Sequence, residues 1–197
     1  DVLFQQTEYG EGQNPDLNAR TRVFRQRDGA GVVTNRGARE DDQTKFEGYD
    51  FKGNLLRNQR EIVQDYAVLP NWSAPPALEL GVYKTKTTFD ALNRPTSVST
   101  PDNSVVRPAY NAANLLERVD VNLRGAIAPT PFVTNIDYNP KGQRTLITYG
   151  TTDGAGITTT YEYDRETFRL NDLTTRRNAA AFNGSDRPGD VQNLHYT

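Results

Sequence analysis

The 197-residue sequence has no cysteine and a single histidine, His195. Without cysteine, neither a disulfide framework nor a thiolate metal site can form. One histidine supplies no His-based metal cluster, and we expect His195 to have a structural role at a strand end rather than a place in a Ser/His/Asp triad. The sequence therefore predicts no metal, no cofactor and no catalytic residue.

Long apolar runs and an excess of one charge are also absent. No stretch approaches the roughly 20 apolar residues of a membrane-spanning helix, and no signal-peptide pattern is present. The 23 basic and 25 acidic residues leave a net charge of −2, whereas binding a phosphate backbone needs a clustered positive excess. Only 35% of the residues are hydrophobic, which suits a sheet with one wet face. We therefore expect no nucleic-acid partner and no membrane segment.

A short pattern recurs along the chain: an aromatic residue, then Asp or Asn, two free positions, and then Gly or Asn. Residues 49–53 read YDFKG, and further copies begin at residues 89, 110 and 138. Two imperfect copies lie at 27–32, which has no aromatic residue in the first position, and at 163–168, where Thr167 occupies the Gly/Asn position. The chain is therefore a repeat array.

The residue types allowed at each position indicate a backbone turn. An Asp or Asn side chain bonds backbone N–H groups just ahead of it, and the position three residues later takes residues that tolerate positive φ. A type I turn closed by a left-handed residue is a common three-residue hairpin loop. The capping position holds Asp28, Asp50, Asp90, Asn111, Asn139 and Asp164. The left-handed position holds Gly31, Gly53, Asn93, Asn114 and Gly142. The aromatic position holds Tyr49, Phe89, Tyr110, Tyr138 and Tyr163, for which we expect packing between strands.

β-Branched and aromatic residues alternate between these turns, as in strands. The pattern predicts one all-β region over 1–197, with irregular insertions near 36–48, 67–81 and 178–190. Residues 55–66 fit either helical spacing or a long strand with its return, and the surrounding repeat favours the strand. Because the chain begins without Met and stops where a further copy would begin, we expect a fragment of a longer chain. Its unpaired edge strands would then favour self-association.

YDFKGNLL at 49–56, FDALNRP at 89–95 and IDYNPKGQRTLITYG at 136–150 resemble the YD repeats of RHS proteins. The similarity is strongest to the RHS region of the B and C components of bacterial insecticidal toxin-complex (Tc) toxins. It implies an array of antiparallel β-hairpins in an open curved sheet, a segment of an RHS β-shell that encloses a toxin domain of the same polypeptide. It also implies that the partners are the rest of that polypeptide and its C-terminal toxin domain, and a secreted or bacterial cell-surface location. The insertion at 36–48 departs from the family.

Two other functions remain open. Exposed aromatic residues beside Arg and Thr could form a carbohydrate-binding or adhesion module. A glycosidase would need two acids that face each other across a cleft. We expect each repeat Asp instead to cap the backbone of its own turn. The acidic run Glu40-Asp41-Asp42 lacks the alternating ligands of a calcium loop, so we expect a solvated loop there.

Overall fold

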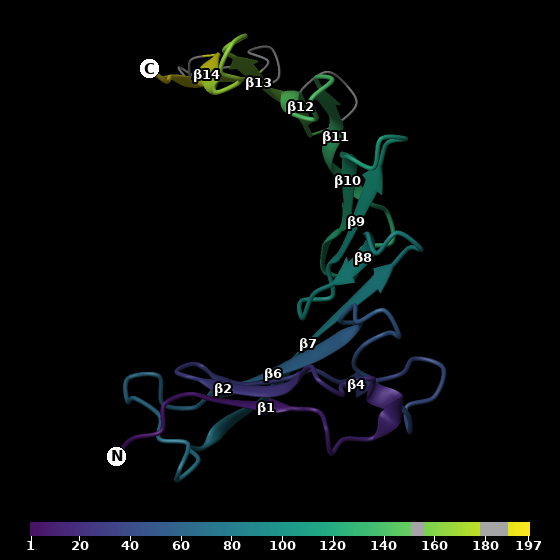
Figure 1. Cartoon of the computed structure of the whole chain (residues 1–197), viewed down its shortest axis with the longest axis vertical. Coiled ribbons are helices and arrows are strands. Elements are labelled where there is room, and N and C mark those ends of the chain that lie inside the picture. Colours follow the sequence, from purple (N-terminus) through teal and green to yellow (C-terminus); the bar gives the residue numbers. More distant parts are fainter. Residues whose placement is uncertain (151–155, 178–188) are drawn as a thin grey trace. The chain divides into compact units, whose positions relative to one another are not determined.

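The computed structural model describes residues 1–150, 156–177 and 189–197, and it consists almost entirely of strands (Figure 1). The strands of the first half are β1 (Gln6–Tyr9), β2 (Val23–Asp28), β3 (Gly31–Thr34), β4 (Gly37–Ala38), β5 (Phe46–Glu47), β6 (Arg57–Val63), β7 (Leu78–Phe89) and β8 (Pro95–Ser99). Those of the second half are β9 (Val105–Tyr110), β10 (Leu116–Asn122), β11 (Thr130–Tyr138), β12 (Arg144–Tyr149), β13 (Ile157–Tyr163), β14 (Leu170–Arg177) and β15 (Asp190–His195). Two 3-10 helices, η1 (Pro15–Leu17) and η2 (Leu123–Gly125), complete the described elements.

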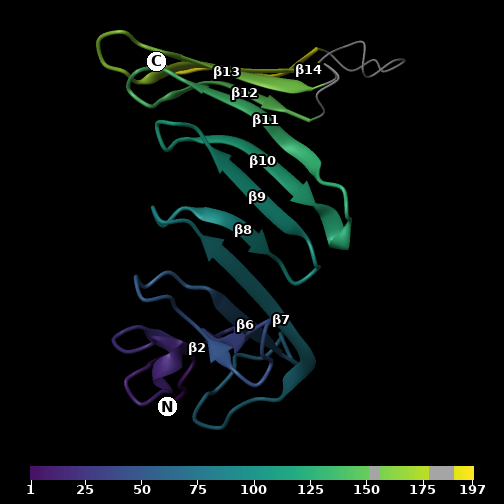
Figure 2. The ribbon, with the colours of Figure 1, turned by 90° about the vertical axis from the view of Figure 1, so that its right-hand side faces the viewer.

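The chain divides into two compact units, residues 1–103 and 104–197. In the first, the strand order is β1-β2-β3-β6-β7-β8, and β4 pairs with β5 separately. In the second, each strand from β9 to β15 pairs with its neighbour in sequence (Figure 2). All the pairs are antiparallel. Among the described residues the strand order of each unit is linear, which confirms the predicted all-β fold of antiparallel hairpins in an open sheet.

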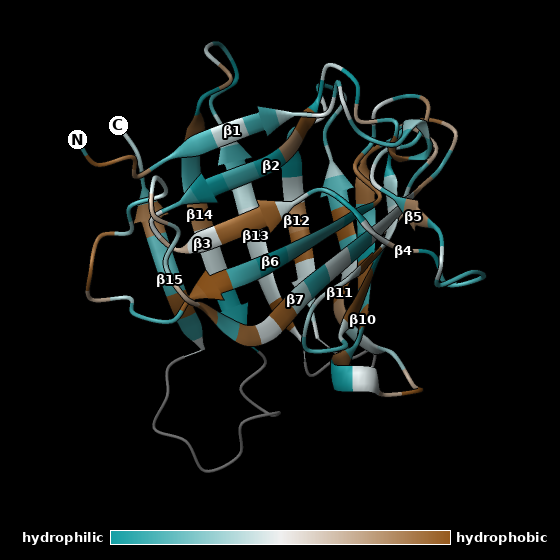
Figure 3. Cartoon of the chain, turned by 90° about the horizontal axis from the view of Figure 1, so that it is seen from below, coloured by the Kyte–Doolittle hydropathy of each residue, from teal (hydrophilic) through white to brown (hydrophobic). Residues whose placement is uncertain are grey.

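A row of side chains across four strands forms the buried centre of the second unit. Ile136 pairs with Ile147, which pairs with Thr159, which in turn pairs with Thr175. The first three are only about 5% exposed, and the two threonine hydroxyls lie 2.9 Å apart. On β13, the exposed Thr160 and Glu162 alternate with Thr159, Tyr161 and Tyr163, which are buried or half-buried. Hydrophilic and hydrophobic residues both lie along the strands (Figure 3). Because side chains on a strand point alternately to the two faces of the sheet, a chain with only 35% hydrophobic residues can still bury one face.

The first unit has two small apolar clusters. One contains Leu17, Ala19, Phe24 and Tyr49, and the other contains Val32, Val63 and Trp72. Trp72 belongs to the segment 67–81 and packs back onto the sheet, where its Nε1 donates to the carbonyl of Asp28 at 3.2 Å. That segment ends within β7, which begins at Leu78.

The segment 36–48 contains the two-stranded sheet of β4 and β5. Its acids reach the main sheet: Glu40 pairs with Lys86 at 2.5 Å, and Glu47 with Arg57 at 2.6 Å. Lys86 and Arg57 are directly paired across β6 and β7. Since like charges in this arrangement repel, the two glutamates stabilise the pair while anchoring the segment.

Residues 55–66 contain the strand β6 (Arg57–Val63), which pairs with β3 and with β7, so the helical reading is wrong. The predicted insertion at 178–190 lies outside the described residues except for its last two positions. Each helix of the described chain is a single turn of three residues, too short to cross a membrane.

Candidate functional site: the hairpin corners of the repeat

Four corners share one hydrogen-bond pattern. At the fourth of them, Asn139 Oδ1 accepts from the N–H groups of Lys141 and Gln143, both at 3.0 Å. The Asn139 N–H donates to the Gln143 carbonyl at 2.9 Å, and the Gly142 N–H donates to the Asn139 carbonyl at 2.9 Å. One short polar side chain thus satisfies two N–H groups that the reversal leaves without strand partners.

The same backbone bonds recur at the other three corners. Asp90 Oδ1 accepts from Leu92 and Arg94, and Asn111 Oδ1 accepts from Ala113 and Leu115. At the corner beginning at Asp50, the carboxylate accepts from the backbone and side chain of Asn54. The residue three positions after the cap is left-handed at every one of these corners. The φ values are 98° at Gly53, 64° at Asn93, 67° at Asn114 and 79° at Gly142.

The two imperfect copies form different loops. Asp28 pairs with Gly31 directly, so this hairpin has a two-residue loop of Gly29 and Ala30. A Cβ on Gly31 would lie 2.0 Å from the Glu61 carbonyl oxygen, so close approach to β6 requires glycine here. At Asp164 the loop is one residue longer, because Asp164 N–H donates to Arg169 and the left-handed residue is Phe168 rather than Thr167.

The corner carboxylates have lowered pKa values for local reasons. At Asp90 the backbone N–H of Arg94 is the largest cause of the lowered pKa. At Asp164 the main cause of the lowered pKa is the backbone N–H of Thr167. For Asp50, desolvation raises the pKa, but hydrogen bonds from Asn54 outweigh it. Such acids are held ionised as acceptors, which is the opposite of a general acid poised near neutral pH.

At three corners the tyrosine in the aromatic position bonds an earlier strand. The Tyr138 hydroxyl donates to the Leu116 carbonyl at 2.6 Å, and the Tyr163 hydroxyl donates to the Arg144 carbonyl at 2.9 Å. Leu116 is paired with Tyr110, and Arg144 with Tyr138, so each hydroxyl reaches the residue opposite the preceding repeat aromatic. In the first unit, the Tyr49 hydroxyl donates to the Val23 carbonyl at 2.6 Å. The hydroxyls of these three tyrosines are therefore engaged by the backbone.

Neighbouring corners also contact each other, which the repeat pattern did not reveal. In the first unit, Lys52 Nζ donates to the Ala91 carbonyl at 2.6 Å, and Asn54 Nδ2 donates to Asn93 Oδ1 at 3.0 Å. In the second unit, Gln143 Nε2 donates to the Phe168 carbonyl at 2.8 Å. The donors occupy the free positions of the repeat or the position just after it. Long amide or ammonium side chains there are the only sequence signal that could have indicated these contacts.

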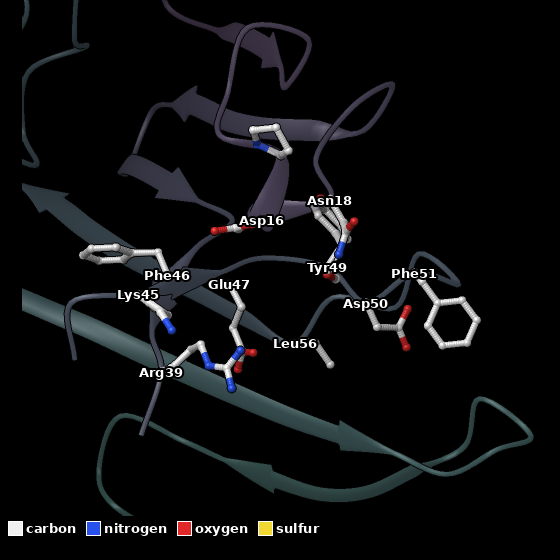
Figure 4. Close-up of a pocket in the computed structure, with 11 residues that line it drawn as sticks. Asp16, Asn18, Arg39, Lys45, Phe46, Glu47, Tyr49, Asp50, Phe51 and Leu56 are labelled. Carbon is white, nitrogen blue, oxygen red and sulfur yellow. Dashed lines mark hydrogen bonds between the residues drawn. The ribbon is translucent and has the colours of Figure 1, made fainter. Parts of the chain in front are cut away.

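An open cleft of about 610 Å³ lies beside the corner at Asp50 (Figure 4). Charged residues of both signs line it, among them Asp16, Arg39, Lys45, Glu47 and Asp50. Three of these charges are held by neighbours: Arg39 pairs with Asp41, Glu47 with Arg57, and Asp50 bonds Asn54. Within the residues that the structure describes, no three His, Cys, Asp or Glu side chains gather as metal ligands.

His195 lies on β15 opposite Asp172 of β14, and its Nδ1 is 2.8 Å from an Asp172 oxygen. The acidic run at 40–42 is used in ion pairs: Glu40 with Lys86, Asp41 with Arg39, and Asp42 with Lys45 at 3.5 Å. The Arg39 guanidinium lowers the pKa of Asp41 to about 2. Each of these charged groups therefore has a structural partner.

No protein-family model and no curated protein sequence matches the chain. Solved structures do match over its whole length. A TcdB2-TccC3-Cdc42 structure has a TM-score of 0.74 at 22% identity, and a TcdB2-TccC3 structure has 0.73 at 21%. A Photorhabdus luminescens Tc holotoxin pore has a TM-score of 0.72 at 22% identity. The chain spans only 8%, 9% and 8% of these three chains, respectively. The expected resemblance to the RHS region of Tc toxin B and C components is confirmed at the level of the fold: this chain folds like one part of the TcdB2-TccC3 chains.

Proposed function

We propose that this chain is a wall segment of an RHS-repeat shell, which encloses and helps to deliver a toxin domain of the same polypeptide. The observation that carries the proposal is the use of the repeat's polar groups. The corner Asp and Asn side chains bond the backbone of their own turns, and the Tyr138 and Tyr163 hydroxyls bond the backbone of earlier strands. Side chains that bond the backbone in this way build the sheet, which supports a structural role for the repeat.

The fold shared with TcdB2-TccC3 chains supports the same role. One of the matching structures is a Tc holotoxin pore, so a wall segment of this fold would belong to a secreted toxin assembly. Its partners are then the neighbouring strands of the longer chain and the enclosed domain. The strands β1 and β15, which begin and end the strand order, offer backbone groups for further pairing.

Protease protection of the complete polypeptide tests the proposal. The domain that follows the repeats resists trypsin if it is enclosed, and it becomes sensitive when the wall is opened. Gly31→Val opens it, because the new side chain would meet the Glu61 carbonyl and separate β3 from β6. Gly29→Val is the matched control, since nothing lies within 4 Å of a Cβ there. Equal digestion in both variants and the parent would contradict enclosure.

A glycan array tests the adhesion alternative on the same protein. Binding to a glycan that is lost on replacing surface tyrosines, with the fold intact, would contradict a purely structural role. The wall proposal predicts no such binding.

A further inference from the structure

Residues 64–69 form an exposed arch between the strands β6 and β7. All six residues of this arch are exposed, and Tyr66, Val68 and Leu69 are 93%, 62% and 64% exposed. Tyr66 is the most exposed aromatic residue that the structure describes. Three large apolar side chains therefore stand in solvent within residues 66–69.

Both ends of the arch are anchored. At its start, the Gln64 N–H donates to the Ala77 carbonyl at 2.9 Å. Beyond its end, the buried Trp72 donates from its backbone N–H to the Leu3 carbonyl at 2.7 Å and from its ring Nε1 to the Asp28 carbonyl at 3.2 Å. The arch therefore spans the gap between two fixed positions.

The backbone of the arch is free between these anchors. From residue 65 to residue 69, the one hydrogen bond within the described chain joins the Ala67 N–H to Asp65 Oδ1 at 3.0 Å. The backbone groups of Tyr66, Val68 and Leu69 have no partner among the described residues. An extended peptide binds another protein through such free N–H and C=O groups. Exposed loops of this kind are the preferred sites of proteolytic nicking.

Exposure alone does not separate the arch from the hairpin corners. Phe51 is 83% exposed, yet its corner is closed by the Gly53 N–H on the Asp50 carbonyl at 3.1 Å and by the Asn54 N–H on Asp50 Oδ1 at 2.8 Å. Extending the chain at that corner breaks both bonds, which costs free energy. The arch loses at most one local bond, so the freedom of the backbone distinguishes Tyr66 from Phe51.

We propose that the peptide bond between Tyr66 and Ala67 is a processing site for an endopeptidase whose specificity pocket takes aromatic side chains, as a chymotrypsin-type pocket does. Hydrolysis of this bond consumes one water molecule and leaves a carboxylate on Tyr66 and an amine on Ala67. The processing site is independent of the shell function.

The sequence of the arch selects both the bond and the class of enzyme. The bond after Leu69 leads into Pro70, whose nitrogen carries no hydrogen and whose ring restricts the residue before it, so this bond is a poor substrate. No Lys or Arg occurs at residues 61–83. A trypsin-type pocket, which binds a basic side chain, therefore finds no bond to cut in the arch. Tyr66 is left as the residue that directs the cut.

The cut leaves the fold assembled, because the two pieces remain paired. On the two sides of the arch, β6 and β7 pair directly from Arg57 with Lys86 to Glu61 with Val82. Glu40 of the first piece also pairs with Lys86 of the second at 2.5 Å. Processing thus replaces a covalent connection by a noncovalent one, and separation of the pieces becomes dependent on concentration.

Limited digestion of the 197-residue chain with chymotrypsin, followed by mass spectrometry, tests the proposal. Within the first unit and beyond β1, the first cut should produce a fragment ending at Tyr66 and a new N-terminus at Ala67. The two pieces should co-elute on gel filtration and separate only in denaturant. Tyr66→Ala should slow the cut about tenfold or more. Phe51→Ala is the matched control, because Phe51 is 83% exposed at a closed corner, and it should leave the rate unchanged.

Two further variants test the bond and the geometry separately. Ala67→Pro keeps Tyr66 but removes the N–H of the bond, and it should abolish the cut. Tyr66→Lys should create a trypsin cut after residue 66. Leu92→Lys is the control for trypsin, because Leu92 is 59% exposed at the corner of Asp90, and it should create no such cut.

Four results would overturn the proposal. One is a first cut elsewhere in residues 10–103, and another is an equal slowing by Tyr66→Ala and Phe51→Ala. The others are digestion of Ala67→Pro at the parent rate and equal trypsin cutting at Tyr66→Lys and Leu92→Lys. Pieces that separate without denaturant would contradict the retained pairing of β6 with β7.

Discussion

Gly142 gives the cleanest test of the left-handed corner. Its φ is 79°, and a Cβ there would meet only a Leu115 methyl at 4.0 Å. The cost of a side chain at this position is therefore backbone strain without steric clash. A β-branched residue forced into this region costs about 1–3 kcal/mol, so we expect Gly142→Val to lower the free energy of unfolding by about 2 kcal/mol.

Two comparisons make this test specific. Gly142→Asn should be close to neutral, because asparagine tolerates the left-handed region and occupies the same position at Asn93 and Asn114 with φ of 64° and 67°. Gly29→Val should also be mild, since Gly29 has open space around it and is not among the described residues with positive φ.

The assay is urea unfolding of the three variants and the parent, followed by circular dichroism. In a thermal scan of the same variants, about 2 kcal/mol would lower the Tm of a chain of this size by roughly 4–8 °C. If Gly142→Asn lost as much stability as Gly142→Val, or if Gly29→Val lost as much, the role of positive φ at the corner would be refuted.

Three further predictions follow from the same geometry. Gly31→Ala should destabilise more than Gly142→Ala, because its Cβ would lie 2.0 Å from the Glu61 carbonyl oxygen; equal losses in thermal unfolding would contradict the close approach of β3 to β6. Tyr138→Phe should lose about 1 kcal/mol in urea unfolding through the missing bond to Leu116, and an unchanged midpoint would show that the bond adds nothing. The pKa of Asp164 is lowered from 3.8 by N–H groups, so its contribution to stability is fully present above pH 3.8 and is lost as the pH falls through the folded value. Asp164→Asn should therefore lose less stability than the parent between pH 5 and 2 in acid titrations, and an identical acid profile would argue against the cap.

The corners at Asp90, Asn111 and Asn139 were accessible from sequence because every contact that defines them is local. A capping oxygen, a left-handed residue and a strand on either side fall within a few positions. The loop at Asp164 shows the limit of this reasoning: its extra residue makes Phe168 left-handed, although phenylalanine carries no such signal.

Contacts between distant residues were not accessible in this way. The segment 36–48 has no period, and Glu40 and Glu47 anchor it through Lys86 and Arg57, up to 46 positions away. The strand β6 was ambiguous alone, since apolar residues at 55–66 fit two periods, and pairing with β3 and β7 decides between them.

The account rests on polar corners that reverse the chain into antiparallel hairpins. Amide hydrogen exchange of the isolated chain, followed residue by residue by NMR, tests this most directly. The N–H groups of Asp90, Asn111 and Asn139 each donate to a backbone carbonyl across a corner, so we expect these N–H groups to exchange slowly. We also expect cross-strand NMR contacts between paired residues such as Ile136 and Ile147. Rapid exchange at all three positions, or contacts of helical spacing through these segments, would contradict the account.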